Sequence, residues 1–538
     1  MAGKGRDFWL TFSAVIVTIF LSALDLTAVA TALPTITERL NGGNLFVWVG
    51  SAYALSSTAI LPLSGRLADI FGRRPIMLSS IFFFALGSAL AGAAQNMHMM
   101  IAARTIQGIG GGGIINLCEI IVSDLVPLSE RGIYQGILGL TWSFASGIGP
   151  PIGGALASTN WRWLFFLNLP LSGIAFVLVS IFLRVKTPPG SISEKVSRVD
   201  WAGNGLGVSG ITLAILGLTW AGVAFPWGSA HVLAPLIIGL VLILVFLLYE
   251  FRMPAHREPT VPYDILSNRN GLSGYLSTFF HGITSISIIY YLPVYFQACF
   301  DATPIRSGVD MLGTALVVAP FALIAGILVQ VLNRYIPSNA AGWVLTTIGF
   351  GLLSMLTYDA PLGHWVGFQF VAAAGTGMIF AATVFPILAP LSVSRTAAAL
   401  GFFAFCRAFA QTWGLTIAST ILQNELSKKL PVAFTDQFAA GFEIAYAAIP
   451  TIRGLPEPLK TEVRQAFAES MAVVWRTMIG ISGAGLLTTL LLTEIPMVQH
   501  TDETYGLHAG ETKDAEGGDA TASGTPEPAA TEERKEAV

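Results

Sequence analysis

Residues 65–75 read GRLADIFGRRP and stand between two apolar stretches. The two glycines permit a helix to end and the chain to turn sharply, and the aspartate can cap a helix or pair with an arginine. Arginines next to apolar stretches are typical of the inner membrane interface. An ordinary basic loop would explain the arginines but not the aspartate and both glycines at this spacing. The segment therefore predicts two membrane helices joined by a short cytoplasmic loop with a specific pattern. The residues that carry the pattern are Gly65, Asp69, Gly72, Arg73 and Arg74.

The composition of the whole chain agrees with a membrane protein. Of 538 residues, 53% are apolar and only 11% are charged, whereas a soluble domain carries roughly 25% charged residues. The mean hydropathy is +0.67 and the formal net charge is -3. These values exclude a disordered chain, a nucleic-acid-binding protein and a soluble enzyme of several domains. The three cysteines all lie in apolar stretches, so we expect no disulfide framework.

Fourteen stretches have about the 20 mostly apolar residues that a membrane-spanning helix needs. We therefore predict an all-α integral membrane protein with fourteen transmembrane helices. The first stretch could instead be a signal peptide, but it is longer than the usual apolar core of one. The predicted spans lie near 8–34, 45–64, 76–95, 98–122, 133–157, 163–183, 203–224, 231–249, 272–296, 308–331, 340–358, 364–387, 397–422 and 471–492.

Lysine and arginine in the short loops predict the orientation. With the N-terminus inside, fifteen of them fall on the inner side and three, Arg39, Arg162 and Arg306, on the outer side. Because positive charge accumulates on the cytoplasmic side, we expect both termini to be cytoplasmic.

Small residues mark two of the predicted spans. Residues 145–154 read ASGIGPPIGG, with Gly149, Pro150, Gly153 and Gly154 in a Gly-Pro-x-x-Gly-Gly order. Small residues let helices pack closely, and proline bends a helix. Residues 108–113 read GIGGGG, a formal match to a dinucleotide fingerprint, but they lie inside an apolar helix and not in a soluble βαβ unit. We interpret this run as close helix packing.

These motifs resemble those of the major facilitator superfamily. The 65–75 segment is similar to its signature loop, which locks the cytoplasmic face, so the resemblance implies that Gly65, Asp69, Gly72, Arg73 and Arg74 form a cytoplasmic gate motif. Residues 149–154 resemble the motif of its antiporters. Residues 24–34, 161–170 and 290–297 resemble the fourteen-span drug:proton antiporter family, especially its fungal members. Family members often carry Asn where Ala30 or Thr31 stands here.

The resemblance covers about residues 10–493 and implies two pseudo-symmetric six-helix bundles with a two-helix insert between them. The resulting boundaries are an N-terminal bundle (1–183), a linker (184–202), the insert (203–250), a C-terminal bundle (251–493) with a long outer loop (426–470), and a tail (494–538). Residues 501–538 hold ten acidic and three basic side chains, so we expect a disordered acidic cytoplasmic tail.

Ionisable residues inside the membrane are costly and are candidates for function. Asp25 and Arg104 lie at a common depth, about 10 Å below the outer boundary at 1.5 Å per residue. They could form a permanent structural pair, but we favour proton coupling. Glu119 either lines the cavity or reaches water at the inner end of its span. His281 either bonds a helix carbonyl or lines the cavity. Arg407 near the midplane needs an anion or a polar cavity. The predicted substrate-cavity residues are Asn116, Glu119, Trp142, His281, Tyr290, Arg407 and Gln411.

The predicted function is proton-coupled antiport that exports amphipathic small organic molecules, such as drugs, toxins or secondary metabolites, by alternating access. We expect a monomer in the plasma membrane, with protons as the energy source and no cofactor, metal site, catalytic residue or nucleic-acid partner. The alternative is a vacuolar transporter of basic amino acids, but that would want more than the two intramembrane acids, Asp25 and Glu119. A membrane enzyme would need clustered catalytic residues, and a sensor would be expected to carry a folded cytoplasmic signalling domain.

Overall fold

The computed structural model describes residues 5–40, 45, 47–185, 188–222, 225–252, 259–435 and 449–497. In these ranges the chain forms helices and turns, with one isolated β-bridge and no sheet, so the prediction of an all-α protein is confirmed. The predicted tail lies outside the described residues from position 498 onward. Its first residues are ordered, because Glu494 accepts hydrogen bonds from the backbone amides of Tyr335 and Ile336 at 3.3 and 3.2 Å.

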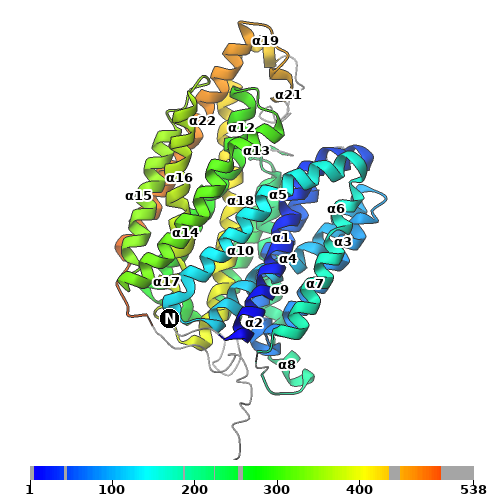
Figure 1. Ribbon diagram of the computed structural model, residues 1–538, viewed down its shortest axis with the longest axis vertical. Helices are drawn as coiled ribbons and strands as arrows, with labels where there is room; N and C mark the ends of the chain where they lie inside the picture. Colours follow the sequence, from blue (N-terminus) through cyan, green and yellow to red (C-terminus); the bar gives the residue numbers. More distant parts are fainter. Residues whose placement is uncertain are drawn as a thin grey trace, which may run out of the picture. The chain divides into compact units, whose positions relative to one another are not determined.

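The first half of the chain contributes six long helices and one short one (Figure 1). These are α1 (Arg6–Arg39), α2 (Val47–Phe71), α3 (Arg73–Gly92), α4 (Met97–Leu125), α5 (Arg131–Asn160), α6 (Arg162–Phe166) and α7 (Asn168–Phe182). The short helix α8 (Ile192–Arg198) follows in the predicted linker and begins with a capping box formed by Ser191 and Glu194. It is followed by α9 (Trp201–Trp220) and α10 (Ala230–Phe251), which pack on each other.

The second half again has six long helices. These are α12 (Arg269–Cys299), α14 (Leu312–Leu332), α15 (Ile336–Leu353), α16 (Leu362–Ala382), α18 (Thr396–Lys429) and α22 (Leu459–Thr488). Short helices connect them: α11 (Tyr263–Ser267), α13 (Pro304–Asp310), α17 (Val384–Leu388), α19 (Val432–Thr435) and α21 (Ile449–Ile452). Part of the predicted outer loop is therefore helical, because α18 and α22 extend into it from either side.

Every predicted span falls on a helix, but the helices differ in how apolar they are. Within the described ranges, eleven helices are long and apolar enough to cross a membrane. The three predicted spans outside this group are α2, α5 and α18, which have 25, 30 and 34 residues. These three helices pack against helices of the other half of the chain. This contact does not by itself explain their lower hydropathy, because α14 packs on α5 across the same boundary and is strongly apolar.

The packing order repeats in the two halves. In the first half α1 packs on α5, α2 on α4, and α3 on both α4 and α7. In the second half, the helices of the same rank make the same pairs: α12 with α18, α14 with α16, and α15 with α16 and α22. The halves meet reciprocally, since the second long helix of each half packs on the fifth of the other, α2 on α18 and α14 on α5.

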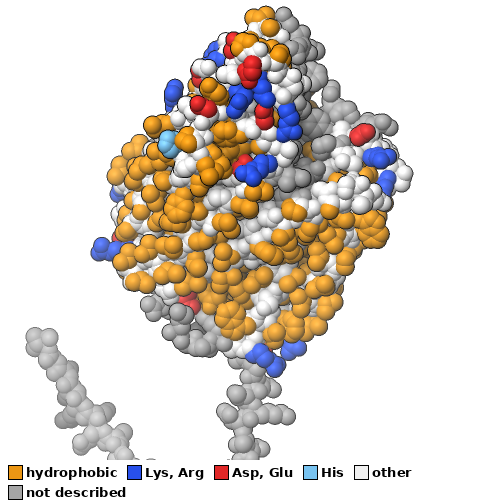
Figure 2. All heavy atoms as spheres, turned by 45° about the horizontal axis from the view of Figure 1, so that its top comes forward, with side chains coloured by type: hydrophobic (Ala, Val, Ile, Leu, Met, Phe, Trp, Pro, Cys, Tyr) orange, Lys and Arg blue, Asp and Glu red, His pale blue; other side chains and the backbone are white. Residues whose placement is uncertain are grey.

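The surface of the helices is apolar where a membrane would lie. Figure 2 shows hydrophobic side chains over much of one face and charged side chains gathered toward its top. On α10, outward side chains such as Ile237, Val241 and Leu244 are half exposed or more. Such a surface is unfavourable in water and favourable in lipid.

Candidate functional site

Asp25 on α1 and Arg104 on α4 form a buried ion pair, as their common depth predicted. Arg104 Nη1 lies 2.7 Å from Asp25 Oδ2, and each residue is 1% exposed. The other carboxylate oxygen, Oδ1, accepts hydrogen bonds from Gln107 at 3.0 Å and from Asn168 at 2.7 Å. The charge of Asp25 is therefore balanced entirely by groups of the first half.

Arg104 makes further contacts besides its ion pair with Asp25. Arg104 Nε donates to the carbonyl of Val49 at 3.0 Å, and the guanidinium lies 4.5 Å from the centre of the Tyr53 ring. No local pattern predicts that Asn168 joins the site, although it lies in the 161–170 motif and is the first residue of α7. It follows Leu167, where the backbone stays helical between α6 and α7, and its amide reaches Asp25 on α1.

Glu119 and Arg407 form a second ion pair, and this one joins the two halves of the chain. Arg407 Nη1 on α18 lies 3.3 Å from Glu119 Oε1 on α4. The guanidinium is sandwiched between the rings of Phe380 and Phe403, each 4.4 Å from its centre. The stacking fixes the plane of the guanidinium, so its N–H groups point along the interface between the halves.

This second pair uses only part of its hydrogen-bonding capacity. Glu119 Oε2 and Arg407 Nε are buried and have no hydrogen-bond partner among the described residues. Glu119 is 6% exposed, so it does not reach water at the end of its span in this conformation. A buried pair with unused donors and acceptors is a place where a polar group of a substrate, or a proton, can bind.

The other predicted cavity residues are spread over several environments. His281 Nε2 lies 3.1 Å from the carbonyl oxygen of Thr376 and its ring packs edge-on against Phe380, which places it behind the Arg407 sandwich. Asn116 is fully buried and donates to the carbonyl of Leu61 and the hydroxyl of Ser64. Trp142 and Gln411 are half-buried, whereas Tyr290 is 48% exposed. The structure thus brings Glu119, Arg407 and His281 together and keeps Tyr290 apart from any buried cluster.

The gate motif is organised around one buried arginine. Arg73 is 2% exposed; its Nη1 lies 2.7 Å from Asp69 Oδ1, and its Nε lies 2.8 Å from Asp124 Oδ2 at the end of α4. Arg74 is exposed and donates instead to the carbonyl of Ser180. Of the two arginines considered as partners of Asp69, Arg73 is the correct one, and Asp124 is a member that the motif did not reveal.

A side chain would be unfavourable at both glycines of the gate motif, but for a different reason at each position. Gly72 has a φ of +99°, a backbone conformation that favours glycine. Gly65 lies at a helix crossing, where a Cβ would stand 2.8 Å from the carbonyl oxygen of Ala397 on α18 and 3.3 Å from Asn116 Nδ2. The absence of a side chain at Gly65 thus lets α2 approach α18.

The glycines of the other small-residue motifs differ in how closely they pack against neighbouring helices. A Cβ on Gly149 would meet Thr27 Oγ1 on α1 at 2.1 Å, whereas one on Gly154 would meet nothing within 4 Å. Gly153 is buried, and the side chain of Pro150 is outside the described part. In α4, a Cβ on Gly111 would stand 1.9 Å from the Tyr53 hydroxyl and one on Gly110 2.3 Å from the Phe84 amide. The interpretation of residues 108–113 as close helix packing is confirmed.

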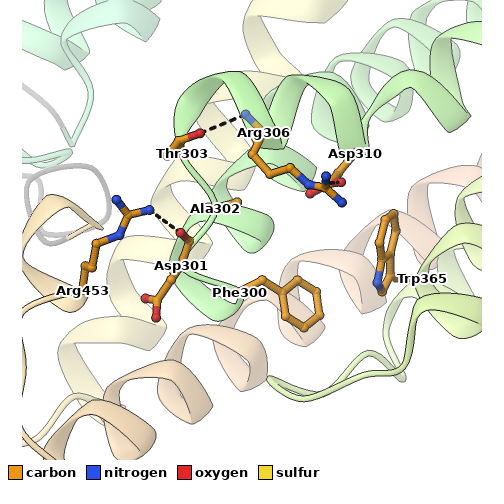
Figure 3. Close-up of a pocket in the computed structure, with 8 residues that line it drawn as sticks. All are labelled: Phe300, Asp301, Ala302, Thr303, Arg306, Asp310, Trp365 and Arg453. Carbon is orange, nitrogen blue, oxygen red and sulfur yellow. Dashed lines mark hydrogen bonds and ion pairs between the residues drawn. The ribbon is translucent and has the colours of Figure 1, made fainter.

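A separate pocket of about 370 Å³ lies in the second half, beside α13. Figure 3 shows Arg453 donating to the carbonyl of Asp301, at 2.5 Å, and Arg306 next to Asp310, at 3.0 Å, with the rings of Phe300 and Trp365 below. Asp301 also pairs with Lys460 at 2.6 Å. Arg306 is therefore paired with a carboxylate, whereas Arg453 donates to a neutral backbone carbonyl and forms no ion pair among the described residues. Across the described ranges, no three His, Cys, Asp or Glu side chains gather as metal ligands would.

Two halves of long apolar helices that repeat the same packing define the class of this protein, an all-helical integral membrane protein. Residues 15–415 match the Major Facilitator Superfamily, and the chain belongs to this family. It is 38% identical over 530 residues to the MFS-type efflux pump LUC4 of Fusarium sp, covering 96% of this chain and 94% of that one. It is 36% identical over 515 residues to the Acurin A biosynthesis cluster MFS-type transporter of Aspergillus aculeatus, covering 94% and 92%.

A solved structure has the same fold. The human organic anion transporter MFSD10 (TETRAN) superposes with a TM-score of 0.58 at 16% identity, covering 90% of this chain and 100% of that one. The family predicted from the sequence motifs is therefore confirmed, together with the likeness to fungal efflux pumps.

Proposed function

We propose that the protein exports amphipathic small organic molecules in exchange for protons, by alternating access between two halves of the fold. The observation that carries this proposal is the Glu119–Arg407 pair, a buried ion pair with unused hydrogen-bonding atoms at the boundary between the halves. A transporter that rocks its halves must break and remake such contacts in each cycle. Relatives named as efflux pumps and as members of biosynthesis clusters support secondary metabolites as substrates.

We also propose that the chain has fourteen membrane spans. They form two pseudo-symmetric six-helix bundles, and α9 and α10 are the insert between them. The repeated pairing of helices in the two halves supports this architecture, and α2, α5, α14 and α18 would be the spans that face the other half. The short-loop charges support cytoplasmic termini, and we propose the plasma membrane as the location. Basic amino acids are a poorer fit, because Arg407 is a cation at the boundary where a basic substrate would bind.

The present conformation supports alternating access. Backbone contacts without intervening side chains close the boundary near the gate motif, at Gly65 opposite Ala397 and at Gly132 opposite Gly326. Close packing of this kind is released only by a movement of whole helices, because packed interfaces have a few discrete arrangements and do not deform continuously.

Proton coupling is proposed for Asp25 with Arg104. Protonation of Asp25 would remove the charge that Arg104, Gln107 and Asn168 bind, and so release α1 from α4 and α7. Asp25→Asn should then abolish proton-driven accumulation while substrate still binds, and Arg104→Ala should impair coupling as well. If Asp25→Asn moved substrate uphill at the wild-type rate, Asp25 would not be the proton carrier, and Glu119 or His281 would be tested next.

The experiment is a flux assay with the purified protein in proteoliposomes under an imposed pH gradient. The panel contains hydrophobic cations, weak organic acids and amino acids, with protein-free liposomes as the control. We expect gradient-driven accumulation of amphipathic organic compounds, accompanied by proton flux in the opposite direction. Accumulation of amino acids alone, or flux that ignores the gradient, would contradict the proposal.

A further inference from the structure

Two carboxyl groups converge at one end of the insert, outside both halves of the fold. Asp200 precedes the first residue of α9, and Glu250 is in the last turn of α10. A Cβ on Gly203 would lie 1.9 Å from Asp200 Oδ2 and 2.9 Å from Glu250 Oε1, so both carboxyl groups face the same point. Glycine at position 203 leaves the room that they occupy.

Neither carboxyl group makes the bonds expected of it. Asp200 stands at the N-cap of α9, where an aspartate usually accepts a backbone hydrogen bond, yet its side chain makes no capping bond. Its Oδ1 accepts a weak bond from the Tyr249 hydroxyl at 3.4 Å, while its buried Oδ2 has no hydrogen bond of ordinary geometry within the described ranges. Glu250 is 2% exposed, and the same is true of both of its buried oxygens.

No cation of the described residues is paired with these two groups. Neither carboxyl group takes part in an ion pair within the described ranges. The nearest basic side chains along the chain, Arg198 on α8 and Arg252 after α10, are both exposed. The facing residues of the segment after the insert, Thr260 and Val261, carry no charge and present backbone amides toward Glu250.

We propose that Asp200 and Glu250 form a proton-binding site in which the two carboxyl groups share one proton. Two carboxylates that face the same largely buried point strongly disfavour ionising together when no cation lies between them, and a shared proton turns their repulsion into a strong O–H···O bond. A calcium or magnesium ion would need six or more oxygen ligands, and no third acidic, histidine or cysteine side chain of the described residues joins the pair. The proton comes from the solution at this end of the insert and returns to it.

The site has a position from which it can regulate transport. Asn204 on α9 donates to Thr260 Oγ1 at 2.9 Å, so the shared proton sits where the insert meets the segment leading to α11. On α11, Asp264 pairs with Arg395 at 2.8 Å, directly before α18. Loss of the proton would drive the two carboxylates apart and loosen the insert from the second half. This inference is independent of the proposed substrate and of Asp25.

The test is pH-difference infrared spectroscopy on the full-length protein in lipid nanodiscs. Wild type should show the carbonyl stretch of one protonated carboxyl group at neutral pH, and Glu250→Gln and Asp200→Asn should each lose it. Asp7→Asn, which removes an exposed carboxyl group in the first turn of α1, is the matched control and should keep it. Absence of the band from wild type, or its persistence in both variants, would overturn the proposal. Appearance of the band only after chelation would also overturn it, because a metal ion would then occupy the site.

Thermal stability gives a second measurement. The melting temperature of wild type should fall as pH rises from mildly acidic to neutral, because over that range the folded protein keeps the shared proton while the carboxyl groups of the unfolded chain lose theirs. Glu250→Gln should not show this fall, because an amide keeps a hydrogen bond to Asp200 without needing a proton. If the melting temperatures of wild type and Glu250→Gln changed with pH in the same way, the proposed site would be contradicted, even if the variant transports normally.

Discussion

Gly132 on α5 and Gly326 on α14 lie backbone to backbone across the boundary between the two halves. A Cβ on Gly132 would stand 2.4 Å from Gly326 Cα, and a Cβ on Gly326 would stand 2.4 Å from the Gly132 carbonyl carbon. Gly65 and Ala397 make the equivalent close contact between α2 and α18. Each contact joins the second long helix of one half to the fifth of the other, so the boundary is closed at two related crossings.

Gly132→Leu should prevent this closure. The added side chain cannot fit against the backbone of α14, so the equilibrium should shift toward a conformation in which the crossing is open. Spin labels at the exposed residues Arg6 and Ser392, one in each half, would report a longer distance by pulsed electron spectroscopy. Gly139→Leu is the control on the same helix, because a Cβ there would meet nothing within 4 Å. An identical distance distribution in Gly132→Leu and wild type would show that the crossing does not govern the conformation.

The Glu119–Arg407 pair predicts a strongly non-additive pair of mutations. Glu119→Gln leaves the Arg407 guanidinium without its counter-ion in a largely buried place, which costs about 3–5 kcal/mol in buried pairs. Arg407→Gln likewise leaves the buried Glu119 carboxylate without its counter-ion. The double variant should be more stable than either single variant, because no unpaired charge remains. Melting temperatures in detergent would measure this.

The same variants separate stability from transport. All three should transport at a rate lower by about tenfold or more, because the contact that changes during the cycle is gone. Glu425→Gln, which breaks an exposed pair with Lys428 in the last turns of α18, should change neither quantity. Additive losses of stability in the double variant would mean that the two side chains do not interact across the boundary.

Depth along a helix was enough to predict the partner of Asp25, because a rise of 1.5 Å per residue fixes the level of a side chain in a straight span. It was not enough to predict that Glu119 meets Arg407, 288 residues away. That contact depends on how far one half is rotated against the other, which no local pattern encodes. Asn168 and Asp124 were missed for a related reason: each is an ordinary polar residue at a helix end, and only packing turns it toward a buried partner.

Gly72→Ala should destabilise the protein by about 1 kcal/mol or more, because alanine is strained at a φ of +99°. Gly147→Ala, inside α5 with nothing within 4 Å of a Cβ, should be neutral or stabilising, since alanine favours a helix more than glycine does. Melting temperatures of the two variants in the same detergent provide the comparison. Equal shifts for both would show that the turn between α2 and α3 tolerates a side chain.

The last prediction concerns the two carboxylates that hold Arg73. Asp69 on α2 and Asp124 on α4 bind different nitrogens of this buried guanidinium, at 2.7 and 2.8 Å. If they act as one lock, Asp124→Asn should have the phenotype expected of Asp69→Asn, namely normal insertion, little change in substrate affinity and much reduced turnover. The double variant should be no slower than the slower single variant, because both substitutions release the same arginine. Turnover and substrate binding in proteoliposomes, together with the labelling rate of a cysteine introduced near Gly65, would measure these effects. Normal turnover in Asp124→Asn beside slow turnover in Asp69→Asn would restrict the lock to the 65–75 loop, and unchanged labelling and transport in both variants would mean that the motif does not control closure.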